Sequence, residues 1–474
     1  MSSVLKLFVF GATVSIALLV GACDGNSSSA ATEASGDYSA AVRSKVEDAV
    51  WQLPESLATQ VLKERVLSTD YAFDFKLLQA EGYSPARVSA LGDGFVFSTS
   101  LQNLEDMALT DFRTGDVHLL GKLPLTEVEG GENWVWPRIL NIQPLHVSYS
   151  EHEGRQRPIS ADLLMFVSVF DGAPDRRCQF VFVRKFRADL SGQGKHEFLE
   201  NWFESPCVPE EVGTNHSWES GGGLAILPPS LRKDPDNLEF VLTLGHFHAV
   251  HQNDWFDSLP AAEKNLITSA VHISAPGEFE IIATGLRNSQ GLVVVPTSKS
   301  DLGYHLLASD HGPYSGDEIN RIERGNFYGW PDSSFGRRYD ERDRYVHEFE
   351  GLHHEATRPI YYFSETSVAF SPLINVRSDV FRGRWSGLGD LGLTNLIGGA
   401  MVRGSLYRLV YDGQKILTTE EIIIGFRPRS IVESGNHIIV GSDDGILGVL
   451  TPVEIREEGS YRPISETSSE ETSS

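Results

Sequence analysis

The chain is poor in positive charge. Its 40 Lys and Arg side chains stand against 65 Asp and Glu, so the formal net charge is -25. Proteins that bind nucleic acids need basic surfaces to neutralise phosphate groups, and this balance argues against that class of function. The acidity favours solubility and is compatible with cation binding, but it identifies no substrate.

A long apolar run is also missing outside the N-terminus. The run from Leu7 to Ala22 is shorter than the roughly 20 residues that a membrane-spanning helix needs. It follows Lys6 and ends in small residues before Cys23, so residues 1–22 are predicted to be a secretory signal peptide. Because Gly-Ala-Cys resembles a bacterial lipobox, we expect Cys23 to carry lipid and to anchor the protein in the periplasm or cell envelope. The alternative is an ordinary signal peptide with an incidental cysteine.

Cysteine is scarce, with three residues in the whole chain. If Cys23 takes lipid, Cys178 and Cys207 remain as an even pair in an oxidising compartment. Such a disulfide would close a loop of about 30 residues and add ~3 kcal/mol to the free energy of unfolding. Two separately buried thiols are the alternative.

Regular alternation of strands and helices is absent too, which argues against a parallel α/β sheet. The chain instead repeats short runs rich in Val, Ile, Phe and Leu, separated by Gly, Pro, Asp and Asn. These predicted strands are Leu163–Phe170, Gln179–Val183, Leu238–Leu244, Glu280–Ala283, Leu292–Val295, Tyr304–Ala308, Glu421–Ile424, His437–Val440 and Gly445–Leu450.

The region 70–455 is therefore predicted to be a single all-β domain. A β-propeller suits so many short strands, because it closes radially and leaves few exposed edges. A pair of β-sandwiches is the alternative.

Three flanking segments have other compositions. Residues 23–36 are rich in Ser, Ala and Gly and predict a flexible tether. In 37–68, apolar residues recur every three to four positions, which predicts a short helical N-terminal extension broken near Pro54. The Ser-, Glu- and Thr-rich segment 457–474 predicts a disordered acidic tail.

Two polar clusters follow strand-like runs between Gly285 and Pro331. The first is Arg287–Gly291 and the second is His311–Asn320. Sheet proteins present chemistry on loops at the ends of rigid strands, so this stretch is the leading candidate for a functional site. Within it, Gly312-Pro313 forms a turn whose carbonyl groups suit a hard cation, and an acidic turn that is merely solvated is the alternative.

The chain resembles the soluble quinoprotein sugar dehydrogenases, which include aldose and glucose/sorbosone dehydrogenases. The resemblance covers roughly 135–455 and is concentrated in 285–331. It rests on four strings: Arg287-Asn288-x-Gln290-Gly291-Leu292, Gly312-Pro313, Gly316-Asp317-Glu318-Ile319-Asn320 and Asn326-x-Tyr328-Gly329-Trp330-Pro331. It implies a six-bladed β-propeller with pyrroloquinoline quinone (PQQ) over the central channel, calcium beside it, and oxidation of an aldose or related alcohol.

The resemblance also implies roles for single residues. The carbonyl groups of Gly312 and Pro313 would hold the calcium ion. Arg287 and Asn288 would contact cofactor and substrate, and Arg287 would polarise the developing oxyanion.

Arg427-Pro428-Arg429 stands where the family has an Arg-x-Arg that binds the carboxylates of the cofactor. Two guanidinium groups suit a tricarboxylate through paired, charged hydrogen bonds. An exposed basic turn is the alternative.

His216 precedes Gly221-Gly222-Gly223-Leu224, as the general base of the family precedes a Gly-rich segment. Imidazole suits the role because its pKa lies near neutrality. A loop histidine without a role is the alternative.

The chain departs from the family pattern at His246 and at Val402. His246 stands after Gly245 where the family has an Asp that orients the base, and Val402 stands where the glucose enzymes have a Lys. Histidines 246, 248 and 251 with Asp254 form a second candidate cluster, for zinc or copper. Two other functions therefore stay open: a non-catalytic propeller that binds a glycan or a protein, and a calcium-dependent lactonase or hydrolase. The electron acceptor of a dehydrogenase is not identified by the sequence.

Overall fold

The structure is a computed structural model, and all the residues that it describes belong to the unit Trp51–Ser474. The described ranges are 59–67, 72–100, 106–125, 134–152, 154–172, 177–192, 194–209, 219–247, 265–301, 303–337, 356–364, 367–377, 392–455 and 461–463.

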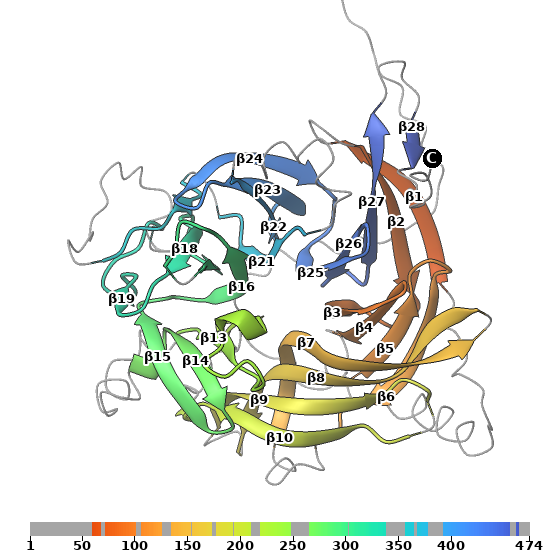
Figure 1. Ribbon diagram of the computed structural model, residues 1–474, viewed down its shortest axis with the longest axis horizontal. Coiled ribbons are helices and arrows are strands. Elements are labelled where there is room, and N and C mark those ends of the chain that lie inside the picture. Colours follow the sequence, from red (N-terminus) through yellow and green to blue (C-terminus); the bar gives the residue numbers. More distant parts are fainter. Residues whose placement is uncertain are drawn as a thin grey trace, which may run out of the picture. The chain divides into compact units, whose positions relative to one another are not determined.

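Six antiparallel sheets are arranged around a common centre and form the blades of a β-propeller (Figure 1). Blades one and two contain β3 (Pro85–Gly92), β4 (Phe95–Ser100), β5 (Asp106–Asp111) and β6 (Asp116–Lys122), then β7 (Trp134–His152), β8 (Arg155–Asp171), β9 (Cys178–Asp189), β10 (Glu197–Glu204) and β11 (Val208–Pro209). Blades three and four contain β12 (Gly221–Ile226), β13 (Phe240–Leu244), β14 (Ser269–Ala275), β15 (Glu278–Thr284) and β19 (Asn326–Phe327), then β16 (Ser289–Pro296), β17 (Tyr304–Asp310), β18 (Glu318–Ile322) and β20 (Tyr361–Tyr362). Blades five and six contain β21 (Phe370–Asn375), β22 (Thr394–Ala400), β23 (Ser405–Tyr411) and β24 (Ile416–Ile423), then β25 (Pro428–Ser434), β26 (His437–Ser442), β27 (Leu447–Ile455), β2 (Ala72–Ala80), β1 (Thr59–Leu67) and β28 (Tyr461–Pro463).

Blade six combines strands from the beginning of the propeller, β1 and β2, with strands from its end, β25 to β28. Strand β2 pairs with β27 in an antiparallel ladder, in which Phe75 lies opposite Leu450. Pairing an early strand with a late one closes the ring by hydrogen bonds and satisfies two strand edges that would otherwise stay open.

The first strands of the blades surround the centre of the ring, because each lies beside the first strand of the next blade. These strands are β3, β7, β12, β16, β21 and β25. Within each blade the second strand runs antiparallel to the first, so it ends where the first begins. The starts of the first strands and the ends of the second strands thus form one face, here called the strand-start face.

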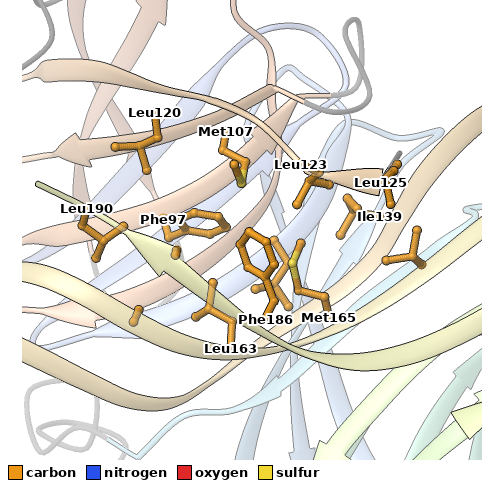
Figure 2. Close-up of a cluster of buried hydrophobic side chains, with 14 of the residues drawn as sticks. Phe97, Met107, Leu120, Leu123, Leu125, Ile139, Leu163, Met165, Phe186 and Leu190 are labelled. Carbon is orange, nitrogen blue, oxygen red and sulfur yellow. The ribbon is translucent and has the colours of Figure 1, made fainter. Parts of the chain in front are cut away.

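The core consists of apolar side chains between neighbouring blades. Phe97 and Met107 from blade one meet Met165 and Phe186 from blade two, and all four are fully buried (Figure 2). Burying an aromatic or aliphatic side chain of this size contributes about 1.5–3 kcal/mol. The blade contacts therefore give the loops of the strand-start face a rigid support.

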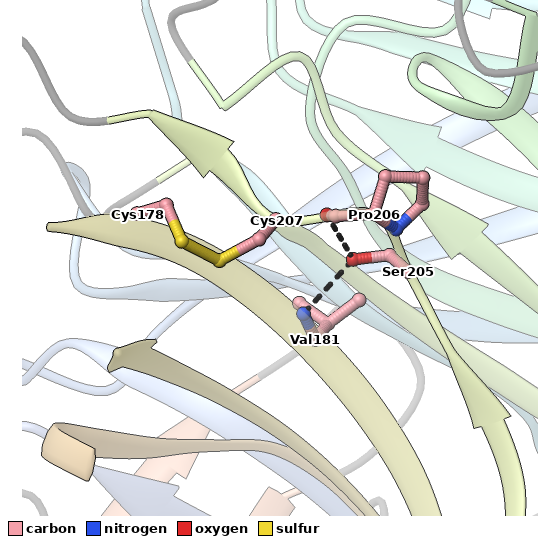
Figure 3. Close-up of a disulfide and its surroundings, with 5 residues drawn as sticks. All are labelled: Cys178, Val181, Ser205, Pro206 and Cys207. Carbon is pink, nitrogen blue, oxygen red and sulfur yellow. Dashed lines mark hydrogen bonds between the residues drawn. A yellow bond between two sulfur atoms is a disulfide. The ribbon is translucent and has the colours of Figure 1, made fainter. Parts of the chain in front are cut away.

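Cys178 and Cys207 form the predicted disulfide (Figure 3). Their Cα atoms are 5.4 Å apart. Ser205 reinforces the link, because its hydroxyl accepts a hydrogen bond from the Val181 amide at 3.1 Å. The disulfide ties the segment before β11 to the start of β9.

The all-β, six-bladed propeller expected from the sequence is confirmed, and the alternative of two sandwiches is wrong. Each of the nine predicted runs overlaps a strand. Among the described residues, no helical segment has the length and hydropathy that crossing a membrane requires.

Two predictions about the flanking segments need correction. Thr59–Leu67 is strand β1 and not part of a helical extension, because it pairs along its whole length with β2. Tyr461–Pro463 is strand β28 on β27, so this part of the expected disordered tail is ordered by pairing. The rest of 457–474, together with 1–58, lies outside the described residues.

Candidate functional site

Strand ends bring the predicted polar residues together on the strand-start face, between blades three and four. Arg287 and Asn288 directly precede β16, and His311 and Gly312 follow β17. Antiparallel pairing places the start of β16 beside the end of β17, with Ser289 opposite Asp310. The two polar clusters of the sequence are therefore one site.

The guanidinium group of Arg287 is held on several sides. Its Nη2 donates to Glu219 Oε1 at 2.5 Å, and its Nη1 donates to the carbonyl oxygens of His311 and Gly312 at 3.1 and 3.2 Å. It also lies 5.2 Å from the centre of the Trp330 ring, within the range of a cation–π contact. With only 5% of the residue exposed, the charge is buried and fixed in direction.

Asp310 fixes the backbone that carries Arg287 and Asn288. Its two carboxylate oxygens accept the amides of these residues at 2.8 and 2.6 Å. Burial raises the pKa of Asp310 to about 6, although these hydrogen bonds act in the opposite direction. The Asn288 side chain in turn accepts the Gly221 amide at 3.1 Å, which joins blade four to blade three.

Asp317 supports the Gly312-Pro313 turn in a similar way. It accepts the amide of Gly312 at 3.2 Å and those of Val368 and Ala369 at 2.8 and 3.0 Å. A Cβ on Gly312 would collide with a neighbouring backbone carbonyl, so the turn requires glycine. Within the described ranges, no group of three or more His, Cys, Asp or Glu side chains gathers as a metal site.

Glu219 and His246 form a contact that the sequence did not reveal. The second carboxylate oxygen of Glu219 is paired with Nε2 of His246, which is completely buried. The His246 ring also packs edge-on against Trp330, with 5.3 Å between ring centres. His246 stands where the family has an acidic residue after Gly245. The carboxylate of Glu219, which directly follows the loop of His216 outside the described residues, lies next to His246 instead.

His311 is neutral at ordinary pH. Burial, followed by the charges of Arg287 and Arg429, lowers its pKa to about 3. Its Nδ1 lies 3.5 Å from Nδ2 of Asn288, so with Asn288 as donor the proton is on Nε2. Within the described ranges no hydrogen-bond partner reaches this buried Nε2, which leaves a donor for a ligand oxygen.

Arg427 and Arg429 differ in their surroundings. Arg429 is 5% exposed, and its guanidinium donates to both carboxylate oxygens of Asp443. The distance from Nε to Oδ1 is 2.6 Å, and Nη2 donates to Oδ2. Arg427 is exposed, with its Nε 3.7 Å from Asp443. The exposed-turn interpretation is therefore wrong for Arg429, whose charge also lowers the pKa of His311.

Two further arginines stand beside Arg429, and sequence reasoning missed both. Arg87 lies near the start of β3 and donates from Nη1 to the Arg429 carbonyl at 2.7 Å. Arg138 lies near the start of β7 and is 7% exposed. Burial and the charge of Arg429 lower the pKa of Arg138 to about 9 and lower that of Arg87 as well. The signal in the sequence that could have identified Arg87 and Arg138 is the position of each arginine near the start of a strand that is otherwise largely apolar.

The remaining predicted residues do not contribute to this geometry. Val402 follows β22 with 58% of its surface exposed and brings no charge. His216, His248, His251 and Asp254 lie outside the described residues, so the base and the second metal cluster stay predictions.

Known proteins share both the sequence motif and the fold. Residues 270–449 match the family model described as Glucose / Sorbosone dehydrogenase. Aldose sugar dehydrogenase YliI of Escherichia coli is 30% identical over 175 residues, 36% of this chain and 41% of that protein. Quinoprotein glucose dehydrogenase B of Acinetobacter calcoaceticus is 49% identical over 51 residues, 11% of this chain and 9% of that protein. The chain thus matches less than half the length of these curated relatives.

Solved structures extend the likeness to the whole propeller. The soluble aldose sugar dehydrogenase from Escherichia coli aligns over 83% of this chain and 99% of its own, with a TM-score of 0.52 and 18% identity. A glucose dehydrogenase structure aligns over 77% of this chain and 96% of its own, with a TM-score of 0.51 and 19% identity. At this identity the solved structures show the fold alone. The resemblance seen in the sequence is confirmed: residues 270–449 are similar to the glucose/sorbosone dehydrogenases, and the propeller fold is similar to that of the solved sugar dehydrogenases.

Proposed function

We propose that the protein is a PQQ-dependent dehydrogenase that oxidises an aldose sugar or a related alcohol on the strand-start face. The observation that carries this proposal is the fixed pair Arg287 and Asn288, held by Asp310 next to the Gly312-Pro313 turn. The names of the relatives, an aldose sugar dehydrogenase and a quinoprotein glucose dehydrogenase, support the same chemistry.

The residues present fit a quinone that carries three carboxylates. Arg429 and Arg427 supply positive charge on blade six, and the unpaired Nε2 of His311 supplies a neutral donor on blade four. Guanidinium groups bind carboxylates through charged hydrogen bonds, which are stronger than neutral ones. When bound, PQQ would supply an acceptor for the hydride and its two electrons.

Calcium fits the same site if the cofactor supplies some of its oxygen ligands. The Gly312 carbonyl already accepts a hydrogen bond from Arg287, and Asp310 and Asp317 are committed to backbone amides. A carbonyl oxygen has two lone pairs and can serve a second partner. We therefore propose that Gly312 and Pro313 hold calcium, with the oxygens of the cofactor completing the site, so that calcium binds weakly in its absence.

Residues of the chain would handle the proton and the developing charge. His216 would take the hydroxyl proton of the substrate, and the substrate carbon that bears this hydroxyl would give up a hydride to the quinone. The product is then the lactone or carbonyl compound, oxidised by two electrons. Arg287 would donate to the substrate oxygen as negative charge develops there. Glu219 keeps the guanidinium of Arg287 in place and also contacts His246. An external carrier must then remove the two electrons.

The test combines binding and turnover. The purified mature protein is titrated with PQQ and calcium, binding is followed by absorbance, and dye reduction is measured with a panel of aldoses. We expect saturable PQQ binding and sugar-dependent dye reduction that N288A lowers at least about tenfold. Absence of PQQ binding would overturn the dehydrogenase, and binding without turnover of any aldose would favour the non-catalytic alternative. R187Q is the matched control, because Arg187 is an exposed residue of blade two paired with Asp162.

We also propose that the protein works in the periplasm or cell envelope, attached through lipid on Cys23. The Cys178–Cys207 disulfide supports an oxidising compartment. Replacement C23S should move the protein from the membrane fraction to the soluble fraction, and unchanged membrane association would contradict the anchor.

A further inference from the structure

Glu219, His246 and Arg287 are joined through the main chain as well as through their side chains. The amide of Phe247 donates to the Glu219 carbonyl at 3.0 Å, and the amide of His246 donates to the Arg287 carbonyl at 2.9 Å. A Cβ on Gly245 would collide with the Glu219 carbonyl, so the two segments approach too closely for any residue but glycine. The backbone therefore fixes the starting points of the three side chains independently of their own contacts.

The turn that follows β13 directs His246 inward. Phe247, the next residue, has a φ of 50°, in the left-handed region that bulky side chains rarely adopt. Strain of this kind persists where surrounding packing compensates it, and it collects at functional sites. The compensation is visible here, because Phe247 is buried in the core between blades two and three. The result is an imidazole with no exposed surface that contacts Glu219.

The carboxylate of Glu219 contacts side chains on two sides. One oxygen accepts a hydrogen bond from Nη2 of Arg287 at 2.5 Å, and the other is paired with Nε2 of His246. Because an ionised carboxylate only accepts hydrogen bonds, this contact places a proton on Nε2 of His246. The exposed fraction of the side chain is 12% for Glu219, 6% for Arg287 and 0% for His246. The carboxylate is therefore the member of this group that is most open to solvent.

The other carboxylates of the site have structural tasks. Both oxygens of Asp310 accept backbone amides, and Asp317 accepts three amides. Glu318 is buried and accepts the side-chain amide of Asn320 at 2.9 Å. Moving these groups toward a substrate would leave buried donors without partners, which is costly. Glu219 differs, because its carboxylate contacts a guanidinium and an imidazole.

We propose that Glu219 is the general base of the dehydrogenase and that His246 positions its carboxylate. The inference rests on the proposed function and changes one residue in it. His216 takes the role of the base there by sequence resemblance alone, and its loop lies outside the described residues. Carboxylate and imidazole are then in reverse order to the pattern that the resemblance implies, in which an imidazole is the base and a carboxylate orients it.

The step balances with the groups in place. The proton of the substrate hydroxyl moves to an oxygen of Glu219 while the C–O bond becomes C=O, and the hydride leaves the same carbon with its electron pair for the quinone. Arg287 already contacts this carboxylate, so it lies beside the substrate oxygen on which negative charge develops. The N–H group of His246 keeps the carboxylate oriented and gains no charge itself.

The first test compares variants of the mature protein loaded with PQQ and calcium. A positioned general base contributes about 10²–10⁴-fold, so E219Q should lower kcat at least about a hundredfold. The dissociation constant for PQQ should change by less than about threefold, because an amide oxygen at this position can still accept from Arg287. E219D keeps the carboxylate and should recover part of kcat. E204Q is the matched control, since Glu204 is an exposed glutamate near Arg184 on blade two.

The pH profile separates a base from a structural residue. Among the described residues, the groups that face Glu219 are Arg287, His246 and His311, whose pKa burial lowers and the charge of Glu219 raises. An essential base gives kcat/KM a limb that falls on the acid side. We expect E219Q to lose this limb, whereas a structural role would lower the whole profile and leave its shape. H216A should lower kcat by a smaller factor than E219Q.

The second test needs neither cofactor nor turnover. NMR spectra of protein with isotope-labelled histidine should show the ring N–H of His246 as a slowly exchanging signal, because the ring is buried and bonded to a carboxylate. This signal should vanish in H246Q and shift in E219Q. H246Q keeps an N–H donor, so it should retain more of kcat than H246L. An unchanged signal in E219Q would overturn the positioning role of His246.

The two proposals fail in different measurements. Wild-type protein that binds no PQQ or oxidises no sugar removes the dehydrogenase, and the base with it. Wild-type turnover that E219Q retains within about threefold, or that H216A lowers more than E219Q does, overturns the base alone. If circular dichroism shows that E219Q does not fold, E219D and H246L carry the comparison, and wild-type kcat in both would overturn the proposal.

Discussion

Arg287 and Glu219 form an ion pair between blades three and four, with 2.5 Å between Nη2 and Oε1 and little exposure of either side chain. Because the second oxygen of Glu219 contacts His246, one carboxylate sets the position of two groups of the candidate site. Removing one partner of a buried pair leaves an uncompensated charge, which typically costs more than the pair contributes.

The first prediction concerns this pair. E219Q should lower the free energy of unfolding by about 3 kcal/mol, because Arg287 then stays buried without its counter-charge. Chemical denaturation of E219Q, R287Q and the double variant gives the coupling energy of the two residues. A coupling energy below about 0.5 kcal/mol would show that the two side chains act independently.

The second prediction concerns Asp310, which holds the amides of Arg287 and Asn288. In D310N an NH2 group replaces one of the two accepting oxygens, so one buried amide loses its partner. We expect a loss of about 1–3 kcal/mol in the free energy of unfolding, and a further loss of ligand binding at the displaced Arg287. D116N is the control, because Asp116 is exposed on blade one. Equal effects of D310N and D116N would contradict a special role for Asp310.

The third prediction is a pH dependence carried by Glu318. Burial and then the charge of Asp310 raise its pKa from 4.5 to about 8. Between these values the folded state binds more protons than the unfolded state, so stability falls as the pH rises through this window. E318Q removes this titration and should gain at least about 1.4 kcal/mol relative to the wild type between pH 5 and 8. Urea denaturation at several pH values checks this, and parallel curves for both proteins would refute it.

The fourth prediction concerns the disulfide. Cys178 and Cys207 are 29 residues apart, and closing a loop of this length stabilises a fold by about 3 kcal/mol through the unfolded state. The double variant C178S/C207S should lose about this amount in non-reducing denaturation. A control under reducing conditions should bring the wild type to the level of the variant, and an unchanged midpoint in both experiments would show that the bond adds no stability.

The sequence predicted the propeller well because its signal is local. Runs such as Leu163–Phe170 and Leu292–Val295 carry strand-forming residues between turn residues, and the packing of the blades follows the same pattern. The prediction was wrong for Thr59–Leu67, because its partner strand β2 supplies hydrogen bonds that a periodicity of apolar residues does not report.

The candidate site was predictable only where a motif is contiguous. Arg287, Asn288 and the Gly312-Pro313 turn belong to compact strings, and strand pairing brings them together as expected. The contact of Glu219 with His246 arises within blade three, where the start of β12 pairs with the end of β13. The contact of Arg87 with Arg429 joins residues far apart in the chain, and it arises where the ring closes and β3 lies beside β25.

The measurement that tests the account most directly is an equilibrium titration of the calcium-loaded protein with PQQ, comparing wild type, R429Q and the control R187Q. If the strand-start face is a quinone site, the wild type and R187Q bind PQQ saturably at one site, and R429Q binds it at least about tenfold more weakly because a charged carboxylate contact is lost. Wild-type protein that fails to bind PQQ, or R429Q that binds it with the affinity of R187Q, would contradict the central claim.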